Sequence, residues 1–262
     1  MKTITQLCLA LTLITLTAHA EEARWWKGNL HTHSLWSDGD DYPEMIADWY
    51  RSNDYNFLGI SDHNILAEGQ RWIHVEKNAG GRVAFEKYLK RFSDDWVEFK
   101  VENEVPQVRL KTFAEYQAKM NVPGKFLMIQ SEEITDRFQG LPIHLNATNL
   151  KKHIAPRGGT SPAAVLQNNV NAVLEQRKET GQPMFPHINH PNFGWALKPT
   201  DMIDLKGERF FEVYNGHPSV RNQGDKDHLS TSQMWDIINA YRTGVYKLPL
   251  LFGLATDDSH NY

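Results

Sequence analysis

Cysteine is almost absent from this chain of 262 residues, and its single cysteine is Cys8. The sequence after that position has no thiol, which excludes a disulfide framework and a zinc site built from thiolates. Any metal ion bound by the rest of the chain must therefore be held by histidine, aspartate and glutamate.

The chain also lacks an excess of positive charge. Its 28 Lys and Arg residues are outnumbered by 32 Asp and Glu residues, and the formal net charge is -4. Proteins that bind nucleic acid usually carry a basic face, so we expect no nucleic-acid partner. The sequence has no internal repeat, low-complexity tract or dividing linker, which favours a single α/β domain that is long enough for a proper core.

The start of the chain lacks an apolar stretch of the ~20 residues that a membrane-spanning helix needs. The apolar run over residues 7–16 follows Lys2 and precedes Ala18-His19-Ala20, the small-residue pattern of a cleavage site. We therefore expect residues 1–20 to be a signal peptide and residues 21–262 to be exported to the periplasm or secreted. No stable membrane anchor is expected after cleavage.

Histidine is the residue in excess, with 12 copies. His31 and His33 stand two positions apart, and on an extended strand such residues point to the same side. Asp38 follows just before Gly39 in a predicted turn, where its carboxylate is free to approach the same point. This pattern indicates a metal site, although two polar residues on the solvated side of an edge strand would have the same spacing.

The order of predicted elements is that of a β/α barrel. Short apolar runs predict strands at about residues 24–32, 56–61, 125–130, 143–147, 183–185, 210–214 and 248–255. Apolar residues at helical spacing predict helices at about residues 45–50, 112–120, 161–180 and 232–241. Residues 65–122 interrupt the alternation and predict an insertion, which is either a cap over the strand ends or a peripheral addition.

Most of the predicted strands end in a histidine or an acidic residue. In a parallel α/β barrel these ends meet at one mouth, where active sites are built. The candidates outnumber the ligands of one tetrahedral ion and suit a cluster of two or three ions, bridged by Glu133 and Asp258. Such a cluster activates water for hydrolysis. The candidate ligands are His31, His33, Asp38, His63, Glu133, His144, His190, Asp258 and His260.

Five motifs in order carry a family resemblance: H-T-H-S with S-D-G, S-D-H-N, E-I-T followed by I-H-L, N-H-P, and D-D-S-H. They span about residues 26–260, and with them the chain resembles the polymerase and histidinol phosphatase (PHP) family of metal-dependent phosphoesterases. The export signal and the wording of the first motif look most like the secreted, carbaryl-hydrolase-type branch. The resemblance implies a distorted seven-stranded (β/α) barrel with a site for three metal ions.

The resemblance also implies how the ligands would be shared among the ions. The E-I-T motif favours Glu133 over Glu132 as a metal ligand, and the H-P dipeptide favours His190 over His187. One ion would be held by His31, His33, Glu133 and Asp258, a second by Glu133, His144 and His190, and a third by Asp38, His63 and His260. These ligands accept zinc, manganese or iron.

The chain ends two residues after His260, where similar proteins continue into further helix and strand. We therefore expect a fragment of a longer protein, whose barrel is incompletely closed.

The predicted function is hydrolysis of a small-molecule phosphate ester by a metal-bridging hydroxide. Glu133 would bridge the ions and Asp258 would accept the proton, as the catalytic residues. Arg137 and His217 are candidate contacts to the substrate. The same site would equally suit a carboxylic or carbamate ester, and an inactive metal-binding fragment is an interpretation of another class.

Overall fold

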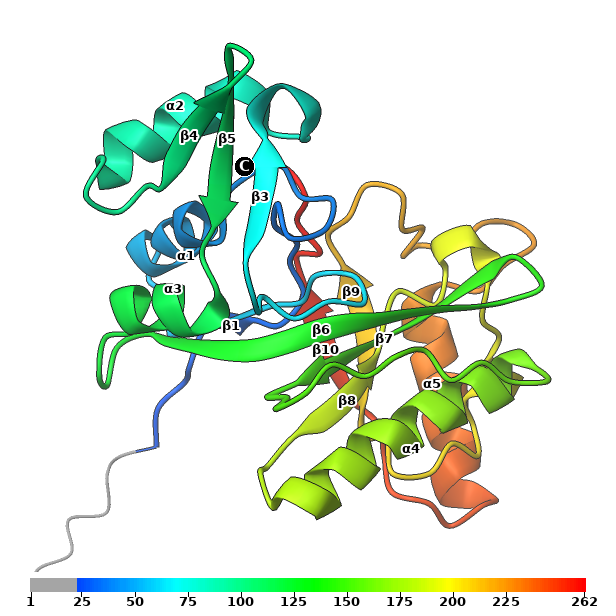
Figure 1. The fold of residues 1–262 in the computed structure, drawn as a ribbon. Coiled ribbons are helices and arrows are strands. Elements are labelled where there is room, and N and C mark those ends of the chain that lie inside the picture. Colours follow the sequence, from blue (N-terminus) through cyan, green and yellow to red (C-terminus); the bar gives the residue numbers. More distant parts are fainter. Residues whose placement is uncertain (1–22) are drawn as a thin grey trace, which may run out of the picture.

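The structure is a computed structural model that describes residues 23–262, so the predicted signal peptide lies outside the described residues. Figure 1 shows a larger body built around a curved sheet and a smaller lobe above its left side. Among the described residues, we find no helix that is both long and apolar enough to cross a membrane.

The larger body is a seven-stranded sheet that curls into a nearly closed barrel (Figure 1). Its strands follow the order β1-β2-β6-β7-β8-β9-β10, and neighbours are parallel except that β7 runs antiparallel to β6 and β8. This architecture confirms the predicted α/β barrel of seven strands. The strands are β1 (Gly28–Asn29), β2 (Phe57–Ile60), β6 (Leu127–Phe138), β7 (Leu141–Thr148), β8 (Phe185–Ile188), β9 (Phe210–Asn215) and β10 (Phe252–Thr256).

The two edges of this sheet meet just beyond β1 and β10. Thr32 and Ser259 form an isolated parallel bridge. On either side of it, His33 N donates to Ser259 O at 2.9 Å and Asp258 N donates to His31 O at 2.9 Å. The barrel is therefore closed by a short seam instead of a full strand ladder, and the seam places the first sequence motif beside the last.

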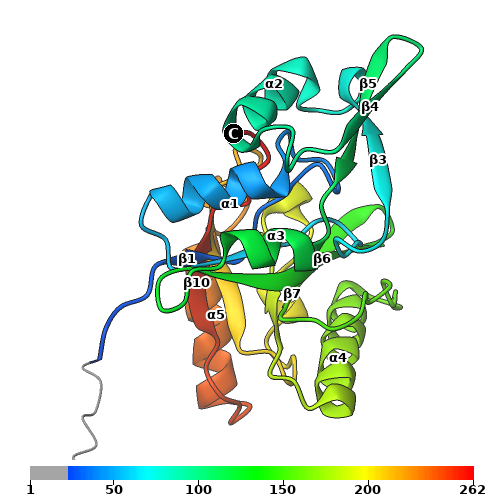
Figure 2. The same ribbon diagram turned by 60° about the vertical axis from the view of Figure 1, so that its left-hand side comes forward.

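Helices cover the outside of the barrel, with α4 against β7 and β8 and α5 against β9 (Figures 1 and 2). The ends of α4 follow from local sequence: the Ser161 hydroxyl accepts a hydrogen bond from Ala164 N, and Gly181 ends the helix with a φ of 67°. The helices are α1 (Pro43–Ser52), α2 (Gly81–Phe92), α3 (Phe113–Met120), α4 (Pro162–Thr180) and α5 (Thr231–Gly244), with short 3-10 turns η1 (Val75–Lys77), η2 (Phe193–Trp195) and η3 (Pro199–Asp201).

The lobe consists of residues 71–110, within the predicted insertion. It has its own three-stranded antiparallel sheet, in the order β3-β5-β4, and the helix α2 (Figure 2). The strands are β3 (Arg71–His74), β4 (Phe99–Glu102) and β5 (Val105–Leu110). The ring of Tyr88 in α2 stacks on Tyr42 at the start of α1, with centroids 4.1 Å apart, so an aromatic contact fixes the lobe to the barrel.

One boundary predicted for the strands is wrong. The strand predicted at residues 125–130 continues to Phe138, because β6 forms a long hairpin with β7 beyond the end of its ladder with β2. Glu133 therefore lies inside a strand and not after one. His144 lies near the start of β7, and it still reaches the barrel mouth because β7 is antiparallel to β6.

Candidate metal centre

The barrel mouth brings the predicted ligands together. Their ligand atoms form overlapping groups, and within each group all atoms lie within 4.8 Å of one another. The grouping is broader than the resemblance implies, because His33 also faces the Asp38 group and His63 also faces Glu133. The groups are His31, His33 and Asp258; His31, Glu133 and His190; His63, Glu133 and His144; and His33, Asp38, His63 and His260.

The deepest part of the cluster is buried and contains unsatisfied ligand atoms. Asp258 Oδ1 lies 3.1 Å from His31 Nε2 and 3.2 Å from His33 Nε2. Within residues 23–262, none of these three atoms has a hydrogen-bond partner. Buried polar atoms without partners cost free energy, and a divalent ion bound between them would remove that cost. The residues present therefore fit a metal ion.

Asp258 reaches this point from an unusual backbone conformation. β10 ends at Thr256, and Asp258 has a φ of 47°, in the left-handed region that non-glycine residues seldom adopt. Asp258 and His260 therefore do not lie on an extended strand. Strain of this kind costs about 1–3 kcal/mol and is concentrated at functional sites, where the surrounding structure holds it.

Glu133 occupies the centre of the cluster. Its Oε1 lies 3.0 Å from His144 Nδ1 and 3.2 Å from His190 Nε2, both within hydrogen-bond distance. Its Oε2 lies 2.7 Å from His63 Nδ1. The two oxygens therefore face different groups of ligands, which is the placement that a bridging carboxylate needs.

The outer part of the cluster is more exposed to solvent. The side chain of Asp38 is 55% exposed, whereas those of His31 and His33 are fully buried. Asp38 Oδ2 lies 3.5 Å from His63 Nε2, and Asp38 Oδ1 lies 3.5 Å from His260 Nε2. The centre therefore has a buried end and an open end.

Burial and pairing shift the pKa values of the cluster in opposite directions. Burial alone would raise the pKa of Glu133, but His144 and His31 lower it well below its usual range. Burial lowers the pKa of His63, whereas Asp38 and Glu133 raise it to about 10. His63 therefore holds its proton tightly, and a metal ion would compete with that proton for the ring. Burial instead lowers the pKa of His33 and of His144.

The neighbouring acid, Glu132, has a different role from Glu133. Its side chain points to the other side of β6, where Oε2 accepts a hydrogen bond from His153 Nδ1 at 2.6 Å and Oε1 accepts one from Ile154 N at 2.7 Å. Glu132 therefore anchors the segment that follows β7, and Glu133 is the acid that faces the cluster.

Glu212 is a buried residue of the site that the sequence analysis missed. It lies on β9 inside the apolar run F-F-E-V-Y, and a buried acid in such a run is the signal that could have identified it. Its Oε1 lies 2.7 Å from His31 Nδ1 and 3.2 Å from His187 Nε2. His187 therefore faces Glu212, whereas His190 faces Glu133.

The two candidate substrate contacts lie in different places. The ring of His217 lies 5.0 Å from that of His260 and lines the cavity in front of the cluster. Its Nδ1 accepts a hydrogen bond from Ser219 N at 3.1 Å, so Nε2 carries the proton of the neutral ring. Arg137 is exposed on β6 and does not line the cavity. The structure brings His217 to the site and leaves Arg137 outside it.

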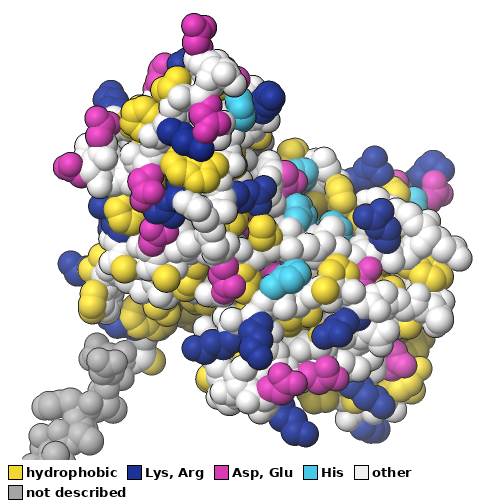
Figure 3. Space-filling view, viewed as in Figure 1, with side chains coloured by type: hydrophobic (Ala, Val, Ile, Leu, Met, Phe, Trp, Pro, Cys, Tyr) yellow, Lys and Arg dark blue, Asp and Glu magenta, His cyan; other side chains and the backbone are white. Residues whose placement is uncertain are grey.

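The cavity in front of the cluster has a volume of about 200 Å³. Apart from the ligands, Phe193 and His217 line it. Within the described part of the chain, no lysine, no arginine and no residue of the 65–122 insertion lines it. Figure 3 shows histidine side chains in the notch between the lobe and the barrel, where the centre is reached from solvent.

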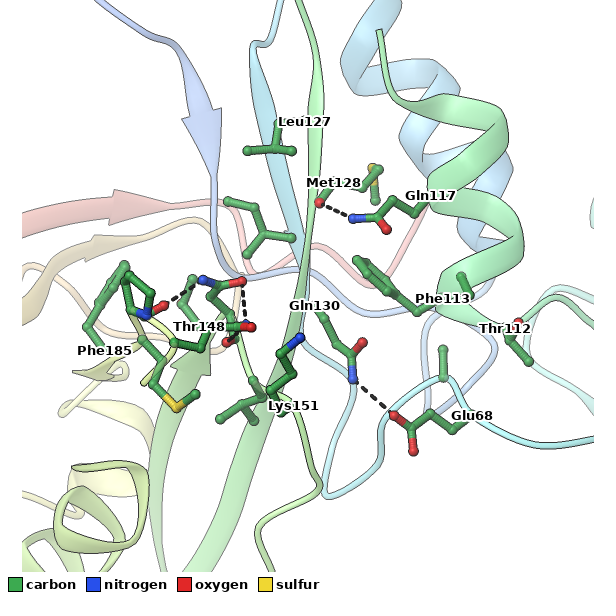
Figure 4. A pocket seen from close by; sticks show the side chains of 18 of the residues that line it. Glu68, Thr112, Phe113, Gln117, Leu127, Met128, Gln130, Thr148, Lys151 and Phe185 are labelled. Carbon is green, nitrogen blue, oxygen red and sulfur yellow. Dashed lines mark hydrogen bonds between the residues drawn. The ribbon is translucent and has the colours of Figure 1, made fainter. Parts of the chain in front are cut away.

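A larger cavity, of about 980 Å³, lies on the outer side of β6, between α3 and the loop after β7. In Figure 4, Gln130 on its wall donates a hydrogen bond to Glu68 at 3.1 Å. This side of the sheet is open because a hairpin, and not a helix, connects β6 to β7. None of the candidate metal ligands lines this cavity, so we assign no chemistry to it.

No family model matches this sequence, and no curated protein matches it either. Among solved structures, a two-domain protein from Bacteroides vulgatus that contains a predicted PHP-like metal-dependent phosphoesterase is 17% identical, with a TM-score of 0.47. The match covers 90% of this chain but only 52% of that protein, so this chain spans about half its length.

Two further structures are similar to a comparable degree. An amidohydrolase from Chromobacterium violaceum is 12% identical, with a TM-score of 0.44, over 90% of this chain and 88% of its own. A protein from Bifidobacterium adolescentis that is assigned as a metal-dependent phosphoesterase is 11% identical, with a TM-score of 0.45, over 91% and 89%. Similarity at this level does not establish a shared activity.

Proposed function

We propose that this chain is a metal-dependent hydrolase that cleaves a phosphate ester of a small molecule. The observation that carries the proposal is the buried convergence of His31, His33 and Asp258, whose facing atoms have no hydrogen-bond partner. A structural zinc site needs only four ligands, whereas this cluster joins several groups through Glu133. Two or three divalent ions, of zinc, manganese or iron, suit these residues.

Divalent ions in this cluster would supply Lewis-acid chemistry, which polarises a substrate oxygen and makes water a stronger nucleophile. The residues that would hold them are His31, His33, Glu133 and Asp258, with His144 and His190, at the buried end, and Asp38, His63 and His260 at the open end. The substrate would approach from the open end, since the other end is closed by the barrel interior.

Asp258 is the residue that we assign to accept the proton of the attacking water. Its Oδ2 accepts a hydrogen bond from Asn215 Nδ2 at 3.0 Å, which orients the carboxylate. Its Oδ1 has no hydrogen bond, and the residue lines the cavity. We assign Glu133 to bridge the ions, because imidazoles surround both of its oxygens.

His217 is the residue that we assign to contact the substrate. Because Ser219 N occupies its Nδ1, the ring offers an N–H donor at Nε2. A hydrogen bond from this atom to an ester oxygen would help to orient the substrate or stabilise its leaving group.

A carboxylic or carbamate ester is the second candidate substrate. A phosphate dianion commonly pairs with lysine or arginine, and none lines the cavity among the described residues. Phe193 lines it instead, with its ring centroid 5.2 Å from that of His190. An uncharged aromatic ester would gain binding affinity from contact with Phe193. A phosphate ester would depend on the ions and on His217 for its binding.

We also propose that the mature protein acts outside the cytoplasm, as the pattern of residues 1–20 predicts. Sequencing the N-terminus of protein recovered from the periplasm or the medium tests this part. The expected first residue is Glu21, and a chain that retains Met1 would contradict it.

The first experiment combines elemental analysis of protein purified without a histidine tag with three ester assays. The substrates are p-nitrophenyl phosphate, bis-p-nitrophenyl phosphate and a p-nitrophenyl carboxylic ester. We expect more than one equivalent of metal and chelator-sensitive turnover of a phosphate ester.

Preference for the carboxylic ester would select the second candidate. Less than one equivalent of metal together with no turnover would overturn the proposal and would leave an inactive protein as the remaining interpretation.

A further inference from the structure

Glu212 has no contact with the substrate cavity, yet it is hydrogen-bonded to the metal ligands. Its side chain is completely buried beneath the cluster and does not line the cavity. Both of its oxygens are engaged by groups from several strand ends. Oε1 lies close to His31 Nδ1 (2.7 Å), Thr256 Oγ1 (2.8 Å) and His187 Nε2 (3.2 Å), and Oε2 accepts from His190 N (2.8 Å) and Asn215 Nδ2 (2.9 Å).

The contact with His31 decides which ring nitrogen faces the cluster. A carboxylate accepts hydrogen bonds only, so His31 Nδ1 carries the proton that it donates to Glu212. His31 Nε2 is left without a proton in the neutral ring, and it is one of the buried atoms that have no hydrogen-bond partner among the described residues. Glu212 therefore presents His31 to an ion in the required tautomer.

Two more ligands are tied to the same carboxylate. The backbone N–H of His190 donates to Glu212 Oε2, which fixes the loop that follows β8. The side-chain amide of Asn215 donates to Glu212 Oε2 and to Asp258 Oδ2, at 2.9 and 3.0 Å. Ligands from three segments of the chain are therefore aligned by one buried acid.

The histidines of the open end have different support. His63 Nδ1 lies 2.5 Å from the Thr135 hydroxyl and 2.7 Å from Glu133 Oε2, and His260 Nδ1 lies 3.0 Å from the backbone oxygen of Asp258. Glu133 is itself a candidate ligand, so none of these contacts is a separate carboxylate that backs the ring in the way Glu212 backs His31. The contrast indicates that the ligands of the buried end are preorganised for metal binding.

We infer that Glu212 is a positioning residue that sets the metal affinity of the buried end. The inference rests on the proposed metal-dependent function. A carboxylate behind a ligand histidine fixes the tautomer and orientation of the ring and makes its free nitrogen more basic. Loss of such a partner commonly lowers metal affinity by about 10–100-fold.

The test compares Glu212→Gln with Glu208→Gln. Glutamine keeps the size of the side chain and removes its charge. Glu208 is a matched control, because it is also completely buried, lies just before β9, and accepts hydrogen bonds from the backbone of Arg209 and Phe210 instead of from a candidate metal ligand. Zinc affinity is measured by competition with a chromophoric chelator, and melting temperatures of the metal-free proteins report the folding of each variant.

We expect the dissociation constant of the tightest zinc ion to rise about 10–100-fold in Glu212→Gln and to stay unchanged in Glu208→Gln. Equal affinities for zinc in Glu212→Gln and in the wild type would overturn this inference alone. A wild type that binds no zinc would overturn the proposed function together with it.

A measurement on the wild type covers the case in which Glu212→Gln does not fold. Nitrogen-15 NMR of the zinc-loaded protein reports the tautomer of His31. A proton on Nδ1 supports the inference, whereas a metal-bound Nδ1 overturns it.

Discussion

Two buried glutamates, Glu133 at the barrel mouth and Glu44 beneath the lobe, are equally shielded from water but have opposite pKa shifts. Burial raises the pKa of Glu44, and hydrogen bonds from Tyr88 and Trp96 offset only part of that rise. At Glu133, imidazoles more than offset the effect of burial, and the pKa falls well below its usual range.

The comparison shows that the partners of a buried carboxyl group, and not its depth, decide the direction in which its pKa shifts. A phenol and an indole satisfy one oxygen of Glu44 without bringing charge, so the effect of burial dominates and the pKa is raised. Imidazoles bring positive charge to Glu133, and metal ions in their midst would bring more. Burial alone therefore does not mark a functional acid, whereas burial among convergent imidazoles does.

The largest expected effect follows from removing the imidazoles at the buried end. His31→Ala combined with His33→Ala should reduce hydrolysis to the background rate, because two ligands of the proposed ions are lost. Ester assays measure the rate, and circular dichroism shows whether the fold remains. The control is His228→Ala, an exposed histidine that pairs with Asp225 at 2.7 Å. Wild-type turnover in the double variant would remove the cluster from the mechanism.

Metal addition should stabilise the barrel mouth and leave the surroundings of Glu44 unaffected. A ligand at 100 times its dissociation constant adds about 2.7 kcal/mol to the free energy of unfolding. For a chain of this size, that corresponds to a rise of about 5–10 °C in melting temperature, reversed by a chelator. The same rise is expected in Glu44→Gln and a smaller one in Glu133→Gln, as measured by calorimetry. An equal rise in both variants would contradict the comparison.

A partial effect is expected at the open end. Asp38→Asn removes the exposed carboxylate that lies 3.5 Å from His63 and from His260. We expect the variant to lose one equivalent of metal, to keep the ions of the buried end, and to lose turnover by about 10²-fold, the scale of one electrostatic contact. Elemental analysis after dialysis measures the stoichiometry. Loss of all the metal would show that the two ends do not bind independently.

The smallest effect concerns the pH dependence of stability. In the unfolded chain Glu44 loses its proton near pH 4.3, whereas its raised pKa in the fold keeps the proton to higher pH. Between these values the folded state binds more protons, so the free energy of unfolding falls as pH rises. Each unit of pKa difference corresponds to about 1.4 kcal/mol. Urea unfolding between pH 4 and 8 should show this decline in the wild type and a flatter profile in Glu44→Gln.

Local patterns were sufficient to predict most of the barrel and most of the side chains that gather at its mouth. The helices predicted at residues 112–120 and 161–180 are α3 and α4, since apolar spacing and capping residues are local signals. The i, i+2 pair of His31 and His33 also converges as predicted, and the ring centroids lie 5.3 Å apart.

Features that depend on contacts between distant segments could not be predicted. The partners of Glu212 come from residues near β1, β8 and β10, and nothing in F-F-E-V-Y indicates which segments fold beside it. The direction of β7 and the left-handed backbone of Asp258 are likewise set by tertiary packing. Arg137 was selected for its place near the E-I-T motif, but its side chain lies on the exposed part of the hairpin.

The seam that closes the barrel joins Thr32 to Ser259, which are 227 residues apart in the sequence. His31 and His33 lie on one side of this seam and Asp258 on the other, so an ion shared by them would be a cross-link between the two edges of the sheet. Closing so long a loop removes conformational entropy from the unfolded chain. The sequence has no cysteine after Cys8 and therefore no disulfide there. A bound ion would instead provide the cross-link that stabilises the closed barrel at the seam.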